Sequence, residues 1–373
     1  PHQPSDKLWP TPLNASDPQL PSLLTEKEVS IPYKSETPLR LNVGDSAHFI
    51  THYDTALFAR RVEELKSNTL TPLDRVQLLH EQTLLARGGI VPTAILIPLL
   101  DAYKNEDTEP VWDMISLAIN ELKKFIEADA EAEQKLRALA GNLARAQYER
   151  LGWEPQPNET ESQAKLRTTI ISLMVYGEDA TVLETAKQTY DTHKLEDLNP
   201  ELRPLIIGAV VRHYPSEQLI TNLIEAYAST SSSDLQQDIA SGLTSTKDPA
   251  VITRLLSLIT DAKTVRPQDA THWFVWLIRN RNGRALTWKW LRDNWGWIET
   301  TFGSDKSYDD FPRYAATALV TDEQLQEYKS FFTPLQKEPA LTRVISIGIS
   351  EIEGRIELIK RDSPAVLQAL RNL

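Results

Sequence analysis

The chain contains no cysteine and only 2 methionines among its 373 residues. Without cysteine it can form neither disulfide bonds nor thiolate metal sites, so His, Asp and Glu are the only strong metal ligands available. The apolar run over residues 89–100 is too short to span a bilayer and is interrupted by prolines. No basic segment precedes an apolar one at the N-terminus, so no signal peptide is predicted.

Positive charge is also in short supply. Lys and Arg number 40 against 52 Asp and Glu, giving a formal net charge of −12. This balance argues against nucleic acid or an anionic membrane as partner, because phosphate groups are bound by Lys and Arg. The length exceeds that of one ordinary core and predicts a small domain followed by a larger or repetitive one. The first residue is Pro rather than Met, which predicts that the natural chain starts upstream.

The sequence contains no glycine-rich phosphate loop, no Gly-x-Ser-x-Gly turn and no other complete active-site motif. A zinc peptidase helix of the His-Glu-x-x-His type needs two imidazoles one turn apart. His80-Glu81 begins this pattern, but Leu84 stands where the second His belongs. His48 and His52 lie in a predicted strand, where residues four apart are separated by about 13 Å and cannot share a metal. We therefore predict no catalytic residue and no metal ligand in this chain.

What the chain does contain, from residue 55 onward, is apolar residues that recur with the period of an α-helix. Capping side chains directly before proline predict four helix starts, and the run Thr321-Asp322-Glu323-Gln324 fits a capping box. The four pairs are Thr71-Pro72, Asn199-Pro200, Asp248-Pro249 and Ser363-Pro364. Three apolar helix faces are predicted. They comprise Leu136, Leu139, Ala140 and Leu143; Ile252, Leu255, Leu256 and Ile259; and, on one further helix, Trp288, Leu291, Trp295, Ile298 and Phe302.

Leu-Arg pairs recur at intervals of roughly 30 to 36 residues, a length typical of helix-hairpin repeats. They occur at Leu136-Arg137, Leu166-Arg167 and Leu202-Arg203, and each is expected to open a helix. The predicted fold is therefore mostly α. It is a HEAT- or armadillo-like, right-handed α-solenoid of helix hairpins over residues 55–373.

Residues 1–54 differ from the rest and predict part of a small β-sandwich that leads into the helical domain. Four short segments alternate or carry strand-forming residues between Pro-, Ser- and Asp-rich turns. They are residues 8–13, 28–33, 39–43 and 47–53. Because four short strands enclose only a thin core, we expect this sheet to be incomplete.

Residues 272–297 hold six of the nine tryptophans. Their plainest interpretation is helix packing, with one helix ending at Asn282-Gly283 and the next beginning after it. Arg279, Arg281 and Arg284 cluster around this junction. Guanidinium groups form bidentate hydrogen bonds with carboxylates, so these three residues are candidates for contacting a peptide in a substrate channel.

Several segments, taken in order, resemble the C-terminal part of an M1-family zinc aminopeptidase of the aminopeptidase N and endoplasmic-reticulum aminopeptidase type. Trp9-Pro10-Thr11-Pro12-Leu13 resembles a Trp-x-Ile-Pro-Leu strand, and residues 41–44 with 48–54 resemble a strand ending in Tyr-Arg-Val-x-Tyr-Asp. Residues 73–75 with 84–89 resemble the first helices of the family's helical domain, and residues 286–295 resemble its Trp-x-Phe-x-x-x-Asn-Trp element. Thr11 replaces the usual Ile, and Ile50 stands where Arg is common. The matches extend from Trp9 to about Phe332.

The resemblance implies that the zinc ligands, the general-base Glu and the residues that bind the substrate's amino terminus lie in upstream domains. None of those motifs occurs in this chain. The family's helical domain caps a thermolysin-like catalytic domain, encloses a chamber and limits access to short or unfolded peptides. The implied function is therefore that of the C-terminal part of a cytoplasmic, zinc-dependent aminopeptidase, inactive alone. Its implied partners are the catalytic domain of the same protein and peptide substrates, and zinc belongs to that catalytic domain.

Two other functions remain open at this point. The first is a non-enzymatic helical-repeat adaptor that binds a protein or peptide partner, because stacked helix hairpins serve adaptors equally well. The second is a self-contained hydrolase that uses scattered carboxylates. Composition and periodicity do not separate these alternatives from an aminopeptidase domain.

Overall fold

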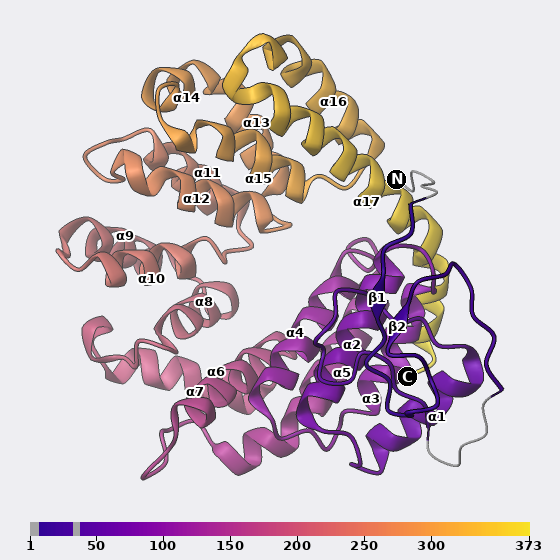
Figure 1. Ribbon diagram of the computed structural model, residues 1–373. Helices are drawn as coiled ribbons and strands as arrows, with labels where there is room; N and C mark the ends of the chain where they lie inside the picture. The colour runs from indigo at the N-terminus through magenta and orange to yellow at the C-terminus, as the bar shows by residue number, and fades with distance from the viewer. Residues whose placement is uncertain (1–6, 33–37) are drawn as a thin grey trace. The chain divides into compact units, whose positions relative to one another are not determined.

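The computed structural model describes residues 7–32 and 38–373, and the chain divides into two compact units (Figure 1). Unit 1 comprises Pro1–Leu173 and Asp362–Leu373, and unit 2 comprises Met174–Arg361. The described residues form 17 α-helices and one two-stranded sheet, which confirms the prediction of a mostly α fold. The predicted division at residue 54 stays a prediction, because the two compact units reflect the density of contacts rather than the change from strand to helix.

Unit 1 begins with a short antiparallel pair of strands. Thr11 of β1 (Thr11–Pro12) is opposite Leu24, and Pro12 is opposite Leu23 of β2 (Leu23–Leu24). The helices of this unit follow, and α2 packs on α3 and α4 while α4 packs on α5. They are α1 (Thr55–Lys66), α2 (Pro72–Arg87), α3 (Leu96–Asp101), α4 (Glu109–Lys123), α5 (Ala130–Leu151) and the larger part of α6 (Glu161–Tyr176).

The predicted β segment is present in reduced form. Residues 8–13 contain β1, whereas residues 28–32, 39–43 and 47–53 form no strand; residue 33 of the predicted segment lies outside the described residues. Residues 47–53 nevertheless alternate between covered and exposed side chains, as a half-buried strand does. Their N–H groups have no neighbouring strand to pair with, and that of Thr51 donates to the Glu81 carboxylate instead, at 3.0 Å. The sequence predicts the alternation of buried and exposed side chains, but it does not reveal that the Thr51 N–H binds Glu81.

Unit 2 is an array in which helices pack mainly on neighbours close in the chain. Contacts join α7 to α8, α8 and α9 to α10, α11 to α12 and α13, and α12 to α15. This organisation is that of a helical repeat; the predicted right-handed sense stays a prediction. The helices are α7 (Ala180–Thr192), α8 (Arg203–His213), α9 (Glu217–Ser229), α10 (Ser233–Leu243), α11 (Pro249–Ile259), α12 (Pro267–Arg279), α13 (Arg284–Asp293), α14 (Trp295–Phe302), α15 (Asp310–Ala318), α16 (Asp322–Phe332) and most of α17 (Pro339–Arg371).

The predicted helix starts are confirmed at Thr71, Asp248 and Thr321, whose side chains accept hydrogen bonds from backbone N–H groups of the first turn. Two of the predicted starts are wrong. Asn199 caps a short turn, and α8 begins only at Arg203. Pro364 lies inside α17 rather than at a helix start. A proline can lie in a helix interior where packing outweighs the loss of one backbone hydrogen bond. No local signal in the sequence reveals that α17 continues through Pro364.

The predicted apolar faces are buried, with one change in how they are arranged. All four residues of the α5 face and all four of the α11 face are buried. The third face, Trp288 to Phe302, is buried as well but belongs to two helices, α13 and α14, which meet at Asn294. The Asn294 amide donates to the Trp290 carbonyl at 2.8 Å and so closes the first of these helices. Of the Leu-Arg pairs, Arg203 opens α8, whereas Leu136 and Leu166 lie within α5 and α6.

A buried arginine joins the loops of unit 1. Arg75 Nε lies 2.7 Å from Glu106 Oε2, and its Nη1 donates to the Leu70 carbonyl at 2.9 Å. The Glu106 carbonyl in turn accepts from Gln147 at 2.8 Å and from Trp112 at 3.0 Å. Buried charges are stable only when paired and hydrogen-bonded. Arg75 therefore fixes the loop before α2 against the loop before α4.

In unit 2, polar side chains likewise bind buried backbone carbonyls, here in the turn that follows α10. Thr244 and Thr246 are buried, and their carbonyls accept from the side-chain amide of Asn280 at 2.8 and 2.7 Å. The Ser245 carbonyl between them accepts from Arg212 at 3.1 Å. Side chains from two other helical segments thus satisfy three consecutive backbone carbonyls. Because buried carbonyls need hydrogen-bond partners, these bonds hold the two segments against the end of α10.

We predict that Arg75→Met lowers the free energy of unfolding by about 3–5 kcal/mol, because Glu106 would remain buried without its cation. Chemical denaturation followed by circular dichroism measures this loss. The matched control is Lys165→Met on α6, which removes the amine from an ion pair with Glu161 at the exposed surface. We expect the control to unfold at nearly the wild-type denaturant concentration. Equal losses in both variants would contradict a special role for the buried pair.

Candidate functional site

The junction between α12 and α13 carries the three arginines singled out from the sequence. Helix α12 ends at Arg279, slightly earlier than predicted, and α13 begins at Arg284. Asn280 anchors the turn through its two hydrogen bonds to the carbonyls after α10. Gly283 is required by space, because a Cβ atom there would lie 2.8 Å from the Leu277 carbonyl oxygen. The junction is therefore a fixed turn rather than a loose loop.

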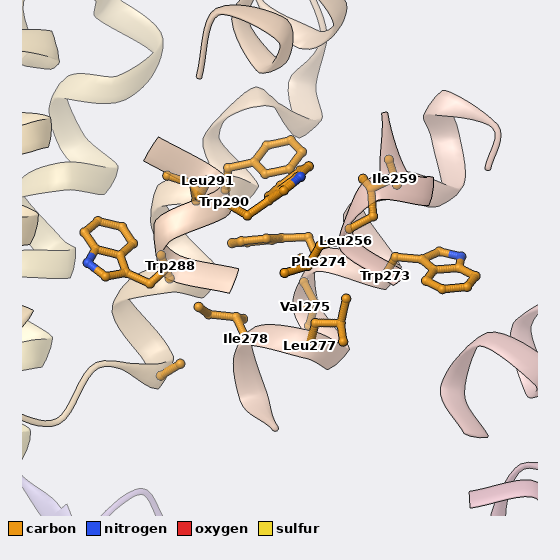
Figure 2. Packing of buried hydrophobic residues seen from close by; sticks show 14 of the residues in the cluster. Leu256, Ile259, Trp273, Phe274, Val275, Leu277, Ile278, Trp288, Trp290 and Leu291 are labelled. Carbon is orange, nitrogen blue, oxygen red and sulfur yellow. The ribbon is translucent and has the colours of Figure 1, made fainter. Parts of the chain in front are cut away.

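Most of the tryptophans in residues 272–297 face the core, as predicted. Trp273, Trp288, Trp290 and Trp295 are buried, and Trp276 and Trp297 are partly buried against the same cluster. Figure 2 shows Trp290 beside Phe274, with ring centroids 6.3 Å apart. The indole N–H of Trp273 donates to the Tyr227 hydroxyl at 3.2 Å. Such aromatic pairs stabilise a core beyond the area that they bury, so these rings hold the junction in place.

The three candidate arginines differ in how exposed their side chains are. Arg279 and Arg281 are exposed, whereas Arg284 is partly buried at the first residue of α13. The Arg279 guanidinium lies over the ring of Tyr314, with Cζ 5.2 Å from the centroid. Arg313 approaches the same ring, with Cζ at 5.5 Å. The cation–π contacts hold two guanidinium groups near one aromatic side chain while leaving both arginines exposed.

Sequence reasoning missed Arg313 and a second arginine, Arg343, which line a neighbouring open pocket of about 530 Å³ in unit 2. The apolar part of its lining includes Val344 and Ile347 from α17, and Glu351 adds a carboxylate. Arg343 is exposed, and so is Ile347 one turn later. In the sequence this spacing is indistinguishable from the outer face of any amphipathic helix. Nothing in it indicates a pocket.

The histidines singled out from the sequence are exposed. His80 is exposed on α2, whereas the adjacent Glu81 is buried, and His48 and His52 are exposed in residues 47–53. Across residues 7–32 and 38–373, no three His, Asp or Glu side chains are grouped so as to hold a metal ion. Over the same residues, no helix is both long and apolar enough to cross a membrane.

A second candidate site is an apolar surface on the N-terminal segment. Trp9 exposes 80% of its surface and Leu8 exposes 56%. Leu23 and Val29, from the same segment, are also exposed. We call these four residues the N-terminal apolar surface. Leu23 lies on β2 opposite Pro12 of β1, three residues after Trp9, and exposed apolar side chains on paired strands are candidates for an interaction site.

Comparison with known proteins adds to this geometry. Residues 39–354 match the family described as ERAP1-like C-terminal domain. Aminopeptidase N of Lactobacillus helveticus is 32% identical over 372 residues, which cover 98% of this chain and 44% of that protein. Aminopeptidase N of Lactococcus lactis subsp. cremoris is 31% identical over 376 residues, with the same shares of 98% and 44%.

A plant protein matches over a similar range. Aminopeptidase M1-B of Oryza sativa subsp. japonica is 25% identical over 345 residues, covering 90% of this chain and 39% of that protein. The chain thus spans less than half the length of each of these relatives.

Proposed function

We propose, because this chain belongs to the ERAP1-like C-terminal domain family, that it is the C-terminal part of a zinc-dependent M1 aminopeptidase that removes N-terminal residues from peptides. The predicted resemblance to this family is thereby confirmed. The observation that carries the proposal is the alignment of 98% of the chain with 44% of an aminopeptidase N. In such a protein the remaining length would supply the catalytic domain, and the chain would act on peptides only together with it.

Zinc would be held by that catalytic domain. The described residues of this chain offer no group of three ligands for it, and His80 has no second imidazole one turn away. Bound zinc would supply an activated water and polarise the peptide carbonyl. The residues of this chain would contribute binding and access instead. The cytoplasm as the location of the enzyme is part of the same proposal.

The N-terminal apolar surface supports docking against the catalytic domain. Trp9 and Leu8 are too exposed to contribute to the core of this chain. Burying apolar area releases about 25 cal/mol for each Å², so a partner that covers this surface would gain binding free energy. We place the catalytic domain of the same protein there, because more than half of the aligned aminopeptidase N lies outside the part that matches this chain.

The helical array would cap the catalytic chamber and control the entry of peptides. Helical repeats present extended surfaces that can hold a chain, and the exposed Arg279 and Arg281 could contact a peptide carboxylate. Arg284 remains a candidate that is partly buried. The adaptor hypothesis is less favoured, because the relatives reported above carry aminopeptidase names. Nothing in the described residues supports a self-contained hydrolase.

The first test compares activity with and without the rest of the enzyme. We predict that the purified chain, given zinc and an aminoacyl-anilide, shows no turnover above buffer. The catalytic part mixed with this chain should cleave the anilide, and its activity on longer peptides should change when the chain is added. Zinc-dependent turnover by the chain alone would contradict the proposal. So would a catalytic part whose activity on long peptides does not change when this chain is added.

The second test concerns the arginines. In the full enzyme, Arg279→Gln, Arg281→Gln and Arg284→Gln should lower kcat/KM for longer peptides several-fold more than for a dipeptide-like anilide. The reason is that a distal contact is available only to the longer substrate. Lys289→Gln is the matched control, since Lys289 is exposed on α13 and pairs with Asp293. If each arginine variant affects long and short substrates equally, these residues have only structural roles.

A further inference from the structure

The N-terminal segment is tied to the helices through residues 38–54, which we call the connecting segment. On one side its backbone pairs with residues 13–16. Asn42 N–H donates to the Leu13 carbonyl at 2.9 Å, and Ser16 N–H donates to the Arg40 carbonyl at 2.8 Å. The side chain of Asn42, which is fully buried, closes the loop over residues 42–47 by pairing with Ala47 N–H at 2.8 Å. The strands and the connecting segment therefore form one hydrogen-bonded body.

On its other side the connecting segment is fastened to α2 by two carboxylates. Arg40 donates to Asp74 at 2.7 Å, and Asp74 also completes the capping box with Thr71. Near the middle of α2, Glu81 Oε1 accepts from the Thr51 N–H at 3.0 Å. These two contacts differ in kind. Asp74 pairs with a cation, whereas the donors to Glu81, the Thr51 N–H and the Gln77 side chain, are neutral.

The surroundings of Glu81 make its negative charge costly. Its exposed fraction is only 6%, and the second donor to its carboxylate, Gln77 on α2, is 3.4 Å away. Asp45 of the connecting segment, which is also negative, acts on the Glu81 carboxylate as well, and Arg61 and Arg40 act on Tyr53 beside it. Burial is the main cause that raises the pKa of Glu81 above its ordinary value, and the charge of Asp45 adds to it; the hydrogen bonds from Thr51 and Gln77 oppose the rise.

We propose that Glu81 makes the attachment of the connecting segment to α2 dependent on pH, with the tightest attachment when the carboxyl is protonated. Opening the segment would give Glu81 access to water, where its charge is well solvated. The charged form therefore favours opening, and the protonated form favours the closed state. Because the connecting segment also holds β1 and β2, the pH would set how firmly the N-terminal apolar surface is held.

The direction follows from proton linkage. Closed Glu81 binds its proton more tightly than open Glu81, so closing is favoured at a pH below the ordinary carboxyl range. As the pH rises through the raised pKa of the closed state, that advantage is lost. The opening equilibrium grows about tenfold for each unit by which the pKa is raised. The other titratable group that faces Glu81, Tyr53, has a pKa raised above its usual value of 10.0 by burial and stays neutral throughout this range.

Hydrogen–deuterium exchange of the full chain tests this proposal. The probe is a peptide over residues 47–54, which includes the Thr51 amide, and its rates are corrected for intrinsic exchange between pH 4 and pH 8. We expect protection in the wild-type chain to fall as the pH rises. In Glu81→Gln the amide oxygen still accepts from Thr51, and the fall in protection with rising pH should be absent. A peptide from α4 serves as the internal control for the folded state.

A second variant shifts the transition without touching the buried carboxyl. Asp45→Asn removes the neighbouring negative charge and keeps the oxygen that accepts from Asn42 at 3.2 Å. We expect the same fall in protection, centred at a lower pH than in the wild-type chain. Protection that is independent of pH in the wild-type chain would overturn the proposal. Identical pH dependence in wild type and Glu81→Gln would overturn it too. None of these measurements uses peptidase activity, so their outcome is independent of the proposed function.

Discussion

Backbone carbonyls buried at the ends of helices are the constraint on which this array depends. A helix leaves its last carbonyls without partners, and inside a protein water does not reach them. Here long polar side chains from other segments take that role. Asn280 serves two carbonyls after α10, and Arg355 of α17 donates to the Ala316 and Leu319 carbonyls at the end of α15, at 2.7 and 2.8 Å. A guanidinium suits this task because it carries several donors in a fixed plane.

The need to bind buried carbonyls also explains why several polar and charged side chains of this chain have structural roles. Several polar side chains bind carbonyls of loop residues, namely those of Arg75, Arg203 and Asn280. Arg203 pairs with Asp238 at 3.1 Å and also donates to the Leu198 carbonyl. Residues placed in this way define which segments meet. The candidate residues for function are instead exposed, namely Arg279 and Arg281 of unit 2 and the N-terminal apolar surface of unit 1.

Local signals in the sequence predicted the parts of the fold that depend on local physics. The caps at Thr71 and Asp248 and the buried face of α11 are each set by residues within one or two helical turns. The failures share one cause, which is competition with distant partners. Pro364 continues α17, the stripe from Trp288 to Phe302 breaks at Asn294, and residues 47–53 bond to α2 instead of to a strand. Among site residues, Arg279 was found because it lies beside a tryptophan-rich turn. Arg343 was missed because its pocket is built by helices far apart in the sequence.

We propose that this chain is a dependent part of a peptidase and that it docks on the catalytic domain through the N-terminal apolar surface. Hydroxyl-radical footprinting of Trp9 tests it most directly, by comparing the isolated chain with the full-length enzyme. In the isolated chain Trp9 is 80% exposed, and its oxidation should be fast. In the full-length enzyme the account predicts that oxidation of Trp9 slows markedly, while that of buried Trp112 stays equally slow in both. Equally rapid oxidation of Trp9 in the two proteins would contradict the account.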